Sequence, residues 1–137
     1  MTRFAVRQLG DVPQIPTDPN DPEWYPLQHY FGFTAFGVNV YVAKNDGDEL
    51  IAAHDEAKSA QEELYLVTAG EATFSLDDEE HDAPAVSVVA VPDPSVSRSA
   101  VAKTAGTAIV AVGGERQDEF RSSWQPKWFA AAPQLDG

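Results

Sequence analysis

Apolar and polar residues alternate in short segments along most of the chain, and turn-forming residues separate these segments. Alternation over about four to eight residues is typical of a β-strand with one buried face. Phe36, Val38 and Val40, for example, share one face of such a strand. Short strands with turn signals about every eight to twelve residues predict an all-β sandwich or barrel. The expected strands are residues 4–9 at a sheet edge, 27–43, 49–54, 63–69, 72–76, 80–83, 87–91, 96–102 and 107–112.

Two segments depart from this alternation. Residues 10–26 contain five prolines, which exclude a helix or a central strand and predict an extended arm on the surface. Trp24 and Tyr25 are expected to anchor the arm by burying aromatic area. Residues 114–137 form an aromatic tail, expected to pack on the outer face of a sheet or on a neighbouring subunit. Its aromatic residues Phe120, Trp124 and Trp128 are spaced by four, which permits a short helical turn.

Length and composition fit one domain over residues 1–137, with the barrel in residues 27–113. The chain has no cysteine, which excludes disulfides, thiolate nucleophiles and cysteine zinc sites. No apolar run approaches the roughly 20 residues of a membrane span, and no long apolar segment follows the N-terminal arginines. We therefore expect a cytoplasmic protein with no membrane partner.

The chain carries 22 acidic and 9 basic residues, a formal net charge of −13. Such a surface repels phosphate backbones and anionic lipids, so nucleic acid is excluded as a partner and a membrane surface is disfavoured. Solubility is the more general explanation of the charge. Attraction of a cationic ligand is the alternative.

The candidate functional residues cluster around His54. His54 and Glu56 are two residues apart at the end of an expected strand, so their side chains face the same way. Glu63 begins the next expected strand, from which its carboxylate can converge on the imidazole. An imidazole with one or two carboxylates is a plausible site for a divalent metal such as Fe, Mn, Ni or Zn. Phosphate-binding loops, dinucleotide fingerprints and nucleophile elbows are absent.

The order of these residues resembles the first motif of the cupin superfamily. Gly47 is followed after six residues by His54-x-Glu56, then by Glu63, then after six residues by Gly70. Residues 83–94 resemble the second motif, and the resemblance covers residues 36–112. It implies a small jelly-roll β-barrel, often dimeric, whose mouth commonly holds a metal through three histidines and one glutamate.

The chain departs from this family pattern at the positions expected to bind metal. Glu56 stands where the second histidine is expected, and the segment between His54 and Glu63 is longer than usual. The second-motif histidine falls on Ser97 or Arg98. Strand alternation predicts that Arg98 points outward if Ser97 points inward. Of the expected ligands, His54 and Glu63 remain, with Glu56 as a substitute.

Three hypotheses follow. The first is a small-molecule-binding protein without a full metal site, whose ligand lies inside the barrel. The second is a divergent metal-dependent enzyme of dioxygenase or isomerase type that uses His54, Glu56 and Glu63. The third is a structural homodimer in which the arm and the tail exchange between subunits. The expected ligand-binding residues are Asn39, Tyr41, His54, Glu63, Tyr65 and Ser97.

The remaining histidines and arginines are expected outside this site. His29 is predicted to be a rim or packing residue, and His81 to be solvated in an acidic hairpin. Arg98 and Arg116 are expected to pair with surface carboxylates.

Overall fold

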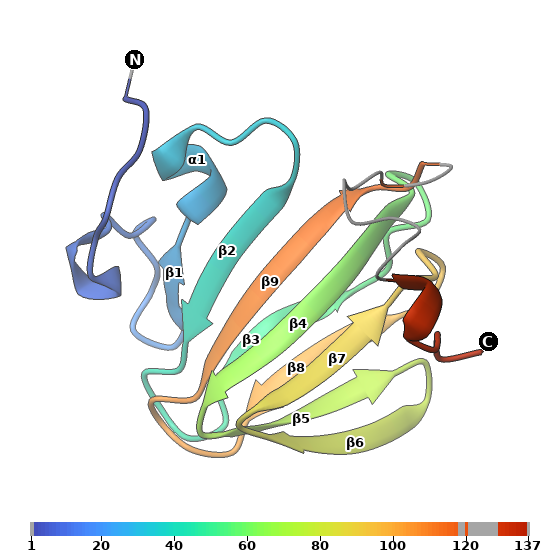
Figure 1. Cartoon of the computed structure of the whole chain (residues 1–137). Helices are drawn as coiled ribbons and strands as arrows, with labels where there is room; N and C mark the ends of the chain where they lie inside the picture. The colour runs from blue at the N-terminus through green and yellow to red at the C-terminus, as the bar shows by residue number, and fades with distance from the viewer. Residues whose placement is uncertain (1, 118–119, 121–128, 137) are drawn as a thin grey trace.

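A computed structural model describes residues 2–117, 120 and 129–136 (Figure 1). Its strands form two antiparallel sheets that face each other in a jelly roll, so the all-β prediction is confirmed. The strands are β1 (Glu23–Tyr25), β2 (Gly37–Val42), β3 (Glu49–His54), β4 (Gln61–Ala69), β5 (Glu71–Leu76), β6 (Glu79–Pro84), β7 (Ser87–Val91), β8 (Arg98–Ala102) and β9 (Ala108–Glu115). One sheet has the order β1-β2-β9-β4-β7, and the other has the order β3-β8-β5-β6.

Three short helical segments accompany the strands: η1 (Leu9–Asp11), α1 (Leu27–Phe31) and η2 (Phe129–Ala131). In the described part of the chain, no helix has the length and apolar character needed to cross a membrane.

Most expected strands are present, and β3 and β7 have the expected bounds. Residues 4–9 do not form the expected strand. Phe4 and Val6 are 84% and 86% exposed, so the apolar side of this alternating segment is not buried against a sheet. The expected strand at residues 27–43 is also wrong in its first half, which forms α1. This helix ends at Gly32, whose positive φ of 76° forms a left-handed cap.

The inner face of β4 changes from polar to apolar along its length. Gln61, Glu63, Tyr65 and Val67 are alternate residues, and their side chains share the face that points between the sheets. Val67 is fully buried in a core cluster that includes Phe74 and Ile109. Gln61 and Glu63 belong to the opposite end of β4. The barrel is therefore filled at one end and offers polar side chains at the other.

The arm folds back on its own barrel. β1 adds to the sheet edge by pairing with β2, and Ile15 forms an isolated bridge with Trp24. Tyr25 is buried against Val12 and Val40 on the outer side of the sheet, as expected of an anchor. Because side chains alternate along β1, Trp24 points to the opposite side, toward the barrel interior. The arm therefore contributes to the interior as well as to the surface.

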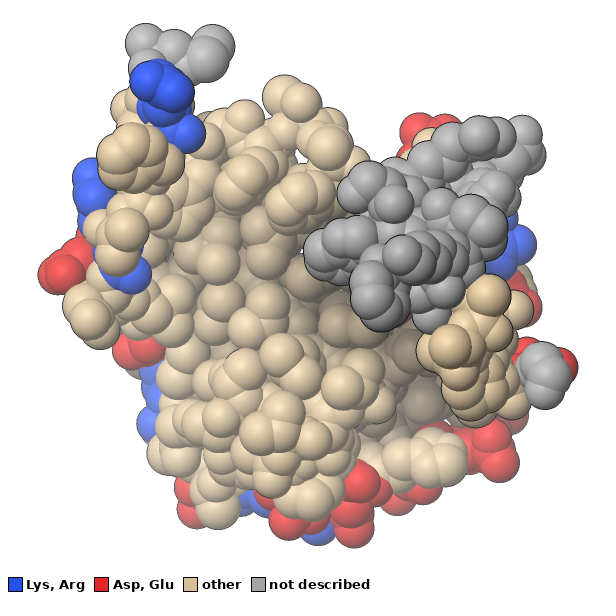
Figure 2. All heavy atoms as spheres, in the orientation of Figure 1, with Lys and Arg blue, Asp and Glu red and all other residues tan. Residues whose placement is uncertain are grey.

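Charged side chains are distributed unevenly over the surface. Figure 2 shows a broad face with few charged residues, bordered by acidic and basic side chains at its rim. Leu64 and Val88, on the outer side of the five-stranded sheet, are 40% and 60% exposed. The aromatic tail cannot be compared with its prediction at Trp124 and Trp128, because both lie outside the described residues.

Candidate functional site

A cavity of about 540 Å³ opens at the polar end of the barrel. Residues of β2, β3, β4 and β9 form most of its lining, Glu56 adds to it from the loop after β3, and the arm supplies the rest. The lining residues that matter for binding are Asp21, Trp24, Asn39, Tyr41, Glu49, Ala52, His54, Glu56, Gln61, Glu63 and Tyr65. Gly37 and Gly113 also line the cavity, and an added Cβ on Gly113 would lie 3.2 Å from the Glu63 side chain.

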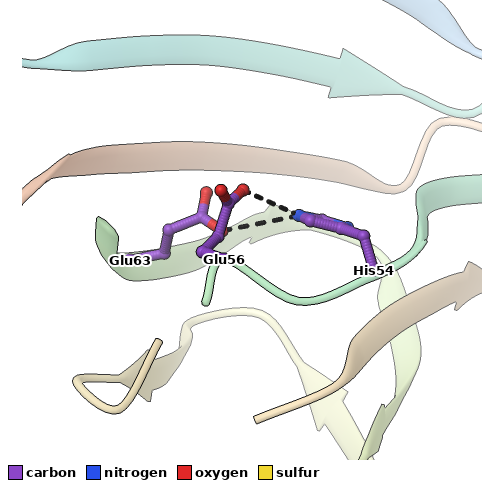
Figure 3. A group of neighbouring side chains, drawn as sticks. All are labelled: His54, Glu56 and Glu63. Carbon is purple, nitrogen blue, oxygen red and sulfur yellow. Dashed lines mark hydrogen bonds and ion pairs between the residues drawn. The ribbon is translucent and has the colours of Figure 1, made fainter. Parts of the chain in front are cut away.

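His54, Glu56 and Glu63 converge in this cavity (Figure 3). The Nε2 atom of His54 lies 3.1 Å from Oε1 of Glu56 and 3.6 Å from Oε1 of Glu63. On the other side of the ring, Nδ1 lies 2.6 Å from the carbonyl oxygen of Ala52. Because a carbonyl oxygen only accepts, Nδ1 carries a proton and donates it there. This bond fixes the ring so that Nε2 faces the two carboxylates.

Local backbone structure holds these side chains in place. Two register irregularities interrupt the pairing of β3 with β8, and the second leads into His54. Such bulges re-aim a side chain at the end of a strand. Glu56 follows β3, and its backbone N–H donates to the carbonyl of Pro94 at 2.8 Å. The Ser59 hydroxyl donates to Oε2 of Glu56 at 2.6 Å.

Glu63 is held by two further groups that lie deeper in the barrel. Arg98 donates from a guanidinium nitrogen to Oε1 of Glu63 at 2.7 Å, and the Tyr65 hydroxyl donates to the same oxygen at 2.9 Å. The Arg98 side chain is 0% exposed, and its remaining nitrogens donate to backbone carbonyls, including that of Val96. The guanidinium is thus fully enclosed, and it compensates the charge of Glu63 from below the cavity.

The position of Arg98 corrects the sequence-based expectation. We expected Arg98 to point outward and to pair with a surface carboxylate, but its side chain is buried and points inward. The turn between β7 and β8 contains Pro92 and Pro94, and alternation does not carry across such a turn. Arg116 does behave as expected, since it pairs with Glu62 at 3.3 Å on the surface.

Two tyrosines keep their hydroxyl protons inside the barrel. Burial raises the pKa of Tyr65, and the nearby Glu63 carboxylate raises it further. Burial also raises the pKa of Tyr41, again with a contribution from Glu63. Tyr65 donates to Glu63, whereas the Tyr41 hydroxyl makes no hydrogen bond within the described residues. The Tyr41 hydroxyl is therefore free to bind a ligand.

The arm supplies site residues that the sequence analysis missed. The indole N–H of Trp24 donates to the Oδ1 atom of Asn39 at 2.8 Å, and the Trp24 ring centre lies 6.1 Å from that of Tyr41. The signal available in the sequence was alternation: if Tyr25 anchors the arm on the outer face, its neighbour Trp24 must face inward. Gln61 was also missed, although it shares the inner face of β4 with Glu63.

Five of the six expected ligand-binding residues lie together in the cavity, and Ser97 does not. Ser97 is exposed and lines a separate depression of about 280 Å³ with Asp77, whose carboxylate accepts the backbone N–H of Ser97 at 3.0 Å. His29 and His81 are exposed and are not among the residues that line the cavity.

The triad meets only part of what a metal site needs. One donor atom from each of His54, Glu56 and Glu63 lies within 4.8 Å of the others, and their chemistry suits a divalent ion. However, Oε1 of Glu63 already accepts two hydrogen bonds, and one comes from a guanidinium cation that repels a second cation. Arg98 and Ser97, where the motif resemblance places a fourth ligand, supply none. The residues present therefore do not fit a full four-ligand site.

Comparison with protein-family models gives no match, and comparison with curated proteins gives none either. Solved structures with the same fold are numerous. A cupin protein from Bacteroides fragilis has a TM-score of 0.70 at 12% identity, covering 92% of this chain and 96% of that one. A cupin-superfamily sugar phosphate isomerase from Silicibacter pomeroyi has a TM-score of 0.66 at 19% identity, covering 82% of this chain and 76% of that one.

A variant of the nucleoside dehydratase Pac13 from Streptomyces, in a structure with uridine, has a TM-score of 0.61 at 13% identity, covering 86% of this chain and 87% of that one. At such identities the likeness concerns the fold alone. It confirms the cupin fold that the motif resemblance predicted.

Proposed function

We propose that this chain, which has the cupin fold, binds a small molecule in the cavity between its sheets and does so without a full metal site. The observation that carries the proposal is the pairing of Glu63 with the buried Arg98 at the bottom of a cavity of about 540 Å³. That volume lies within the roughly 300–1,000 Å³ typical of small-molecule sites. Arg98 supplies permanently the positive charge that a metal would otherwise bring to Glu63.

Several polar groups remain free to hold a ligand. Within the described residues, the Gln61 side chain and the Tyr41 hydroxyl make no hydrogen bond. The amide oxygen of Asn39 accepts from Trp24, which leaves its amino group available as a donor. Trp24 and Tyr41 add aromatic surface. A few fixed polar groups on an apolar and aromatic lining are the usual composition of such sites.

Structural neighbours support a small polar ligand. They include a sugar phosphate isomerase and a nucleoside dehydratase, the latter seen with uridine. Their ligands and reactions belong to those proteins, and we take from them only that cupin-fold cavities of this kind accept small metabolites.

A metal-dependent enzyme of dioxygenase or isomerase type is the second candidate. The observation that favours it is the convergence of His54, Glu56 and Glu63, since three protein ligands can suffice for a catalytic metal. The charge of Arg98 beside Glu63 weighs against it. Ligand binding that persists in the presence of a chelator separates the two candidates.

The test uses two alanines that are adjacent on β3. Ala52 and Ala53 are both exposed, but only Ala52 lines the cavity. Ala52→Trp should fill part of the cavity, whereas Ala53→Trp places the same side chain elsewhere. We expect a screen of small metabolites by thermal shift, with chelator present, to find compounds that stabilise the wild type and Ala53→Trp but not Ala52→Trp. If every stabilising compound acts equally on Ala52→Trp, or if none stabilises the wild type, the cavity is not a binding site.

A further inference from the structure

Among lysine, arginine, aspartate and glutamate, only the acidic residues line the cavity in the described part of the chain. Asp21, Glu49, Glu56 and Glu63 contribute carboxylates to its lining, and no lysine or arginine does among the described residues. Arg98 compensates Glu63, but its side chain is 0% exposed and lies behind that carboxylate rather than in the cavity. No ion pair of the described residues involves Asp21 or Glu49. In the described part of the lining, an anionic ligand would therefore meet unpaired carboxylates and no lysine or arginine.

From this lining we propose that the cavity selects a small organic cation, carrying a protonated amine or a quaternary ammonium group, over neutral and anionic molecules of the same shape. The inference rests on the proposed function, and it adds the chemical class of the ligand.

The triad supports this choice through its hydrogen-bonding character. The carboxylates of Glu56 and Glu63 converge on one point of the cavity wall, each with an oxygen within 3.6 Å of Nε2 of His54. Carboxylates accept hydrogen bonds and attract positive charge, and the ligand atoms of the three residues lie within 4.8 Å of one another. A cationic group is attracted by both carboxylates, and a protonated amine can also donate N–H groups to them.

The aromatic wall supports the same class of ligand. Trp24 and Tyr41 line the cavity with their rings 6.1 Å apart, and the hydrogen bond to Asn39 fixes the Trp24 indole. A cation over an aromatic face is attracted by the ring quadrupole, most strongly by tryptophan. The net charge of −13 adds a long-range attraction for cations.

Three probes of nearly the same shape test the selection. Choline carries a quaternary nitrogen, neopentylcarbinol is the alcohol in which carbon replaces that nitrogen, and tert-butylacetic acid supplies the matching carboxylate. We expect titration calorimetry, with chelator present, to give choline an affinity at least about tenfold above that of the alcohol, from the cation–π and carboxylate contacts. The carboxylate should bind most weakly.

Two charge-matched variants separate the cavity from the overall field. Glu56→Gln removes one negative charge from the cavity, and Glu80→Gln removes one from exposed strand β6. We expect Glu56→Gln to weaken choline binding severalfold more than it weakens binding of the alcohol, and Glu80→Gln to leave both unchanged.

Equal affinities for choline and the alcohol would overturn the cation selection and leave the proposed binding cavity standing. The same holds if Glu80→Gln weakens choline as much as Glu56→Gln does, because the selection would then come from net charge. Failure of all three probes to bind would also overturn it, and the metabolite screen with Ala52→Trp then decides separately whether the cavity binds anything.

Discussion

Arg98 contributes both to the charge balance of the cavity and to the stability of the barrel. Its guanidinium is enclosed, and it compensates a Glu63 side chain that is only 12% exposed. Removing one partner of such a pair leaves an uncompensated charge in the interior, which typically costs about 3–5 kcal/mol. The pair therefore fixes the position of Glu63, and substitution of either Arg98 or Glu63 alone is expected to destabilise the fold.

We predict that Arg98→Met lowers the free energy of unfolding by roughly 3 kcal/mol, because it keeps apolar volume but leaves Glu63 unpaired. Urea denaturation measures the change. Arg116→Met is the control, since Arg116 pairs with Glu62 on the surface and should cost at most about 1 kcal/mol. Adding Glu63→Leu to Arg98→Met should recover part of the loss. Equal effects of the two arginine variants would contradict a buried ion pair.

The buried phenol of Tyr65 predicts a loss of stability in alkali. Burial and Glu63 raise its pKa above the unfolded value of about 10. Its contribution is fully present below about pH 10; above it, the unfolded chain loses the phenolic proton while the folded chain keeps it. The free energy of unfolding should then fall by about 1.4 kcal/mol per pH unit for each such group. Tyr65→Phe should make that fall shallower in denaturation series between about pH 9 and 11; an unchanged slope would contradict it.

At the residue scale, the sequence predicts side chains that lie within one strand better than those separated by a turn. Glu63 and Tyr65 are two apart in β4, so alternation places them correctly on one face. Ser97 and Arg98 follow a proline-containing turn that resets the alternation, and the inward residue is Arg98. Trp24 lies in β1, a strand of only three residues within the arm, too short for its pattern to be evident.

At the scale of elements, the glycine turn between β4 and β5 brings the two sheets into contact. Gly70 has a φ of +68°, and an added Cβ would lie 2.8 Å from the Cα atom of Thr107, which is fully buried. Gly47, before β3, has a φ of +84° but no atom within 4 Å of an added Cβ. Both glycines belong to the motif that predicted the fold, but only Gly70 combines a left-handed backbone with a close approach.

We predict that Gly70→Ala destabilises the fold by roughly 3 kcal/mol, from left-handed backbone strain together with overpacking against Thr107. Gly47→Ala should cost only the backbone term, about 1–2 kcal/mol. Thermal and urea unfolding of the two variants provide the comparison. If Gly47→Ala costs as much as Gly70→Ala, the close approach to Thr107 is not important.

Element boundaries were predictable where a strand is long enough to show its period and ends at turn residues. β3 and β7 meet this condition. Helix α1 does not, because its five residues span little more than one turn and give no helical period. Residues 4–9 show the converse: they alternate as a strand does, but none of the strands in the described part of the chain pairs with them.

For the whole molecule, a net charge of −13 predicts stability that rises with salt. Self-repulsion destabilises a compact, highly charged chain, and added ions screen it within a Debye length of about 10 Å at 0.1 M. The melting temperature should therefore increase from low to molar sodium chloride. A melting temperature that is flat or falls over this range would contradict it. The expected homodimer and the cytoplasmic location stay predictions.

The central claim is a binding cavity in which Arg98, rather than a metal, faces Glu63. It is tested most directly by the metal content of protein purified without an affinity tag, measured by elemental analysis of the wild type and of His54→Ala. We predict far less than one equivalent of Fe, Mn, Ni or Zn per chain, with the same value in both proteins. About one equivalent in the wild type that is lost in His54→Ala would contradict the account and support the metal-dependent enzyme.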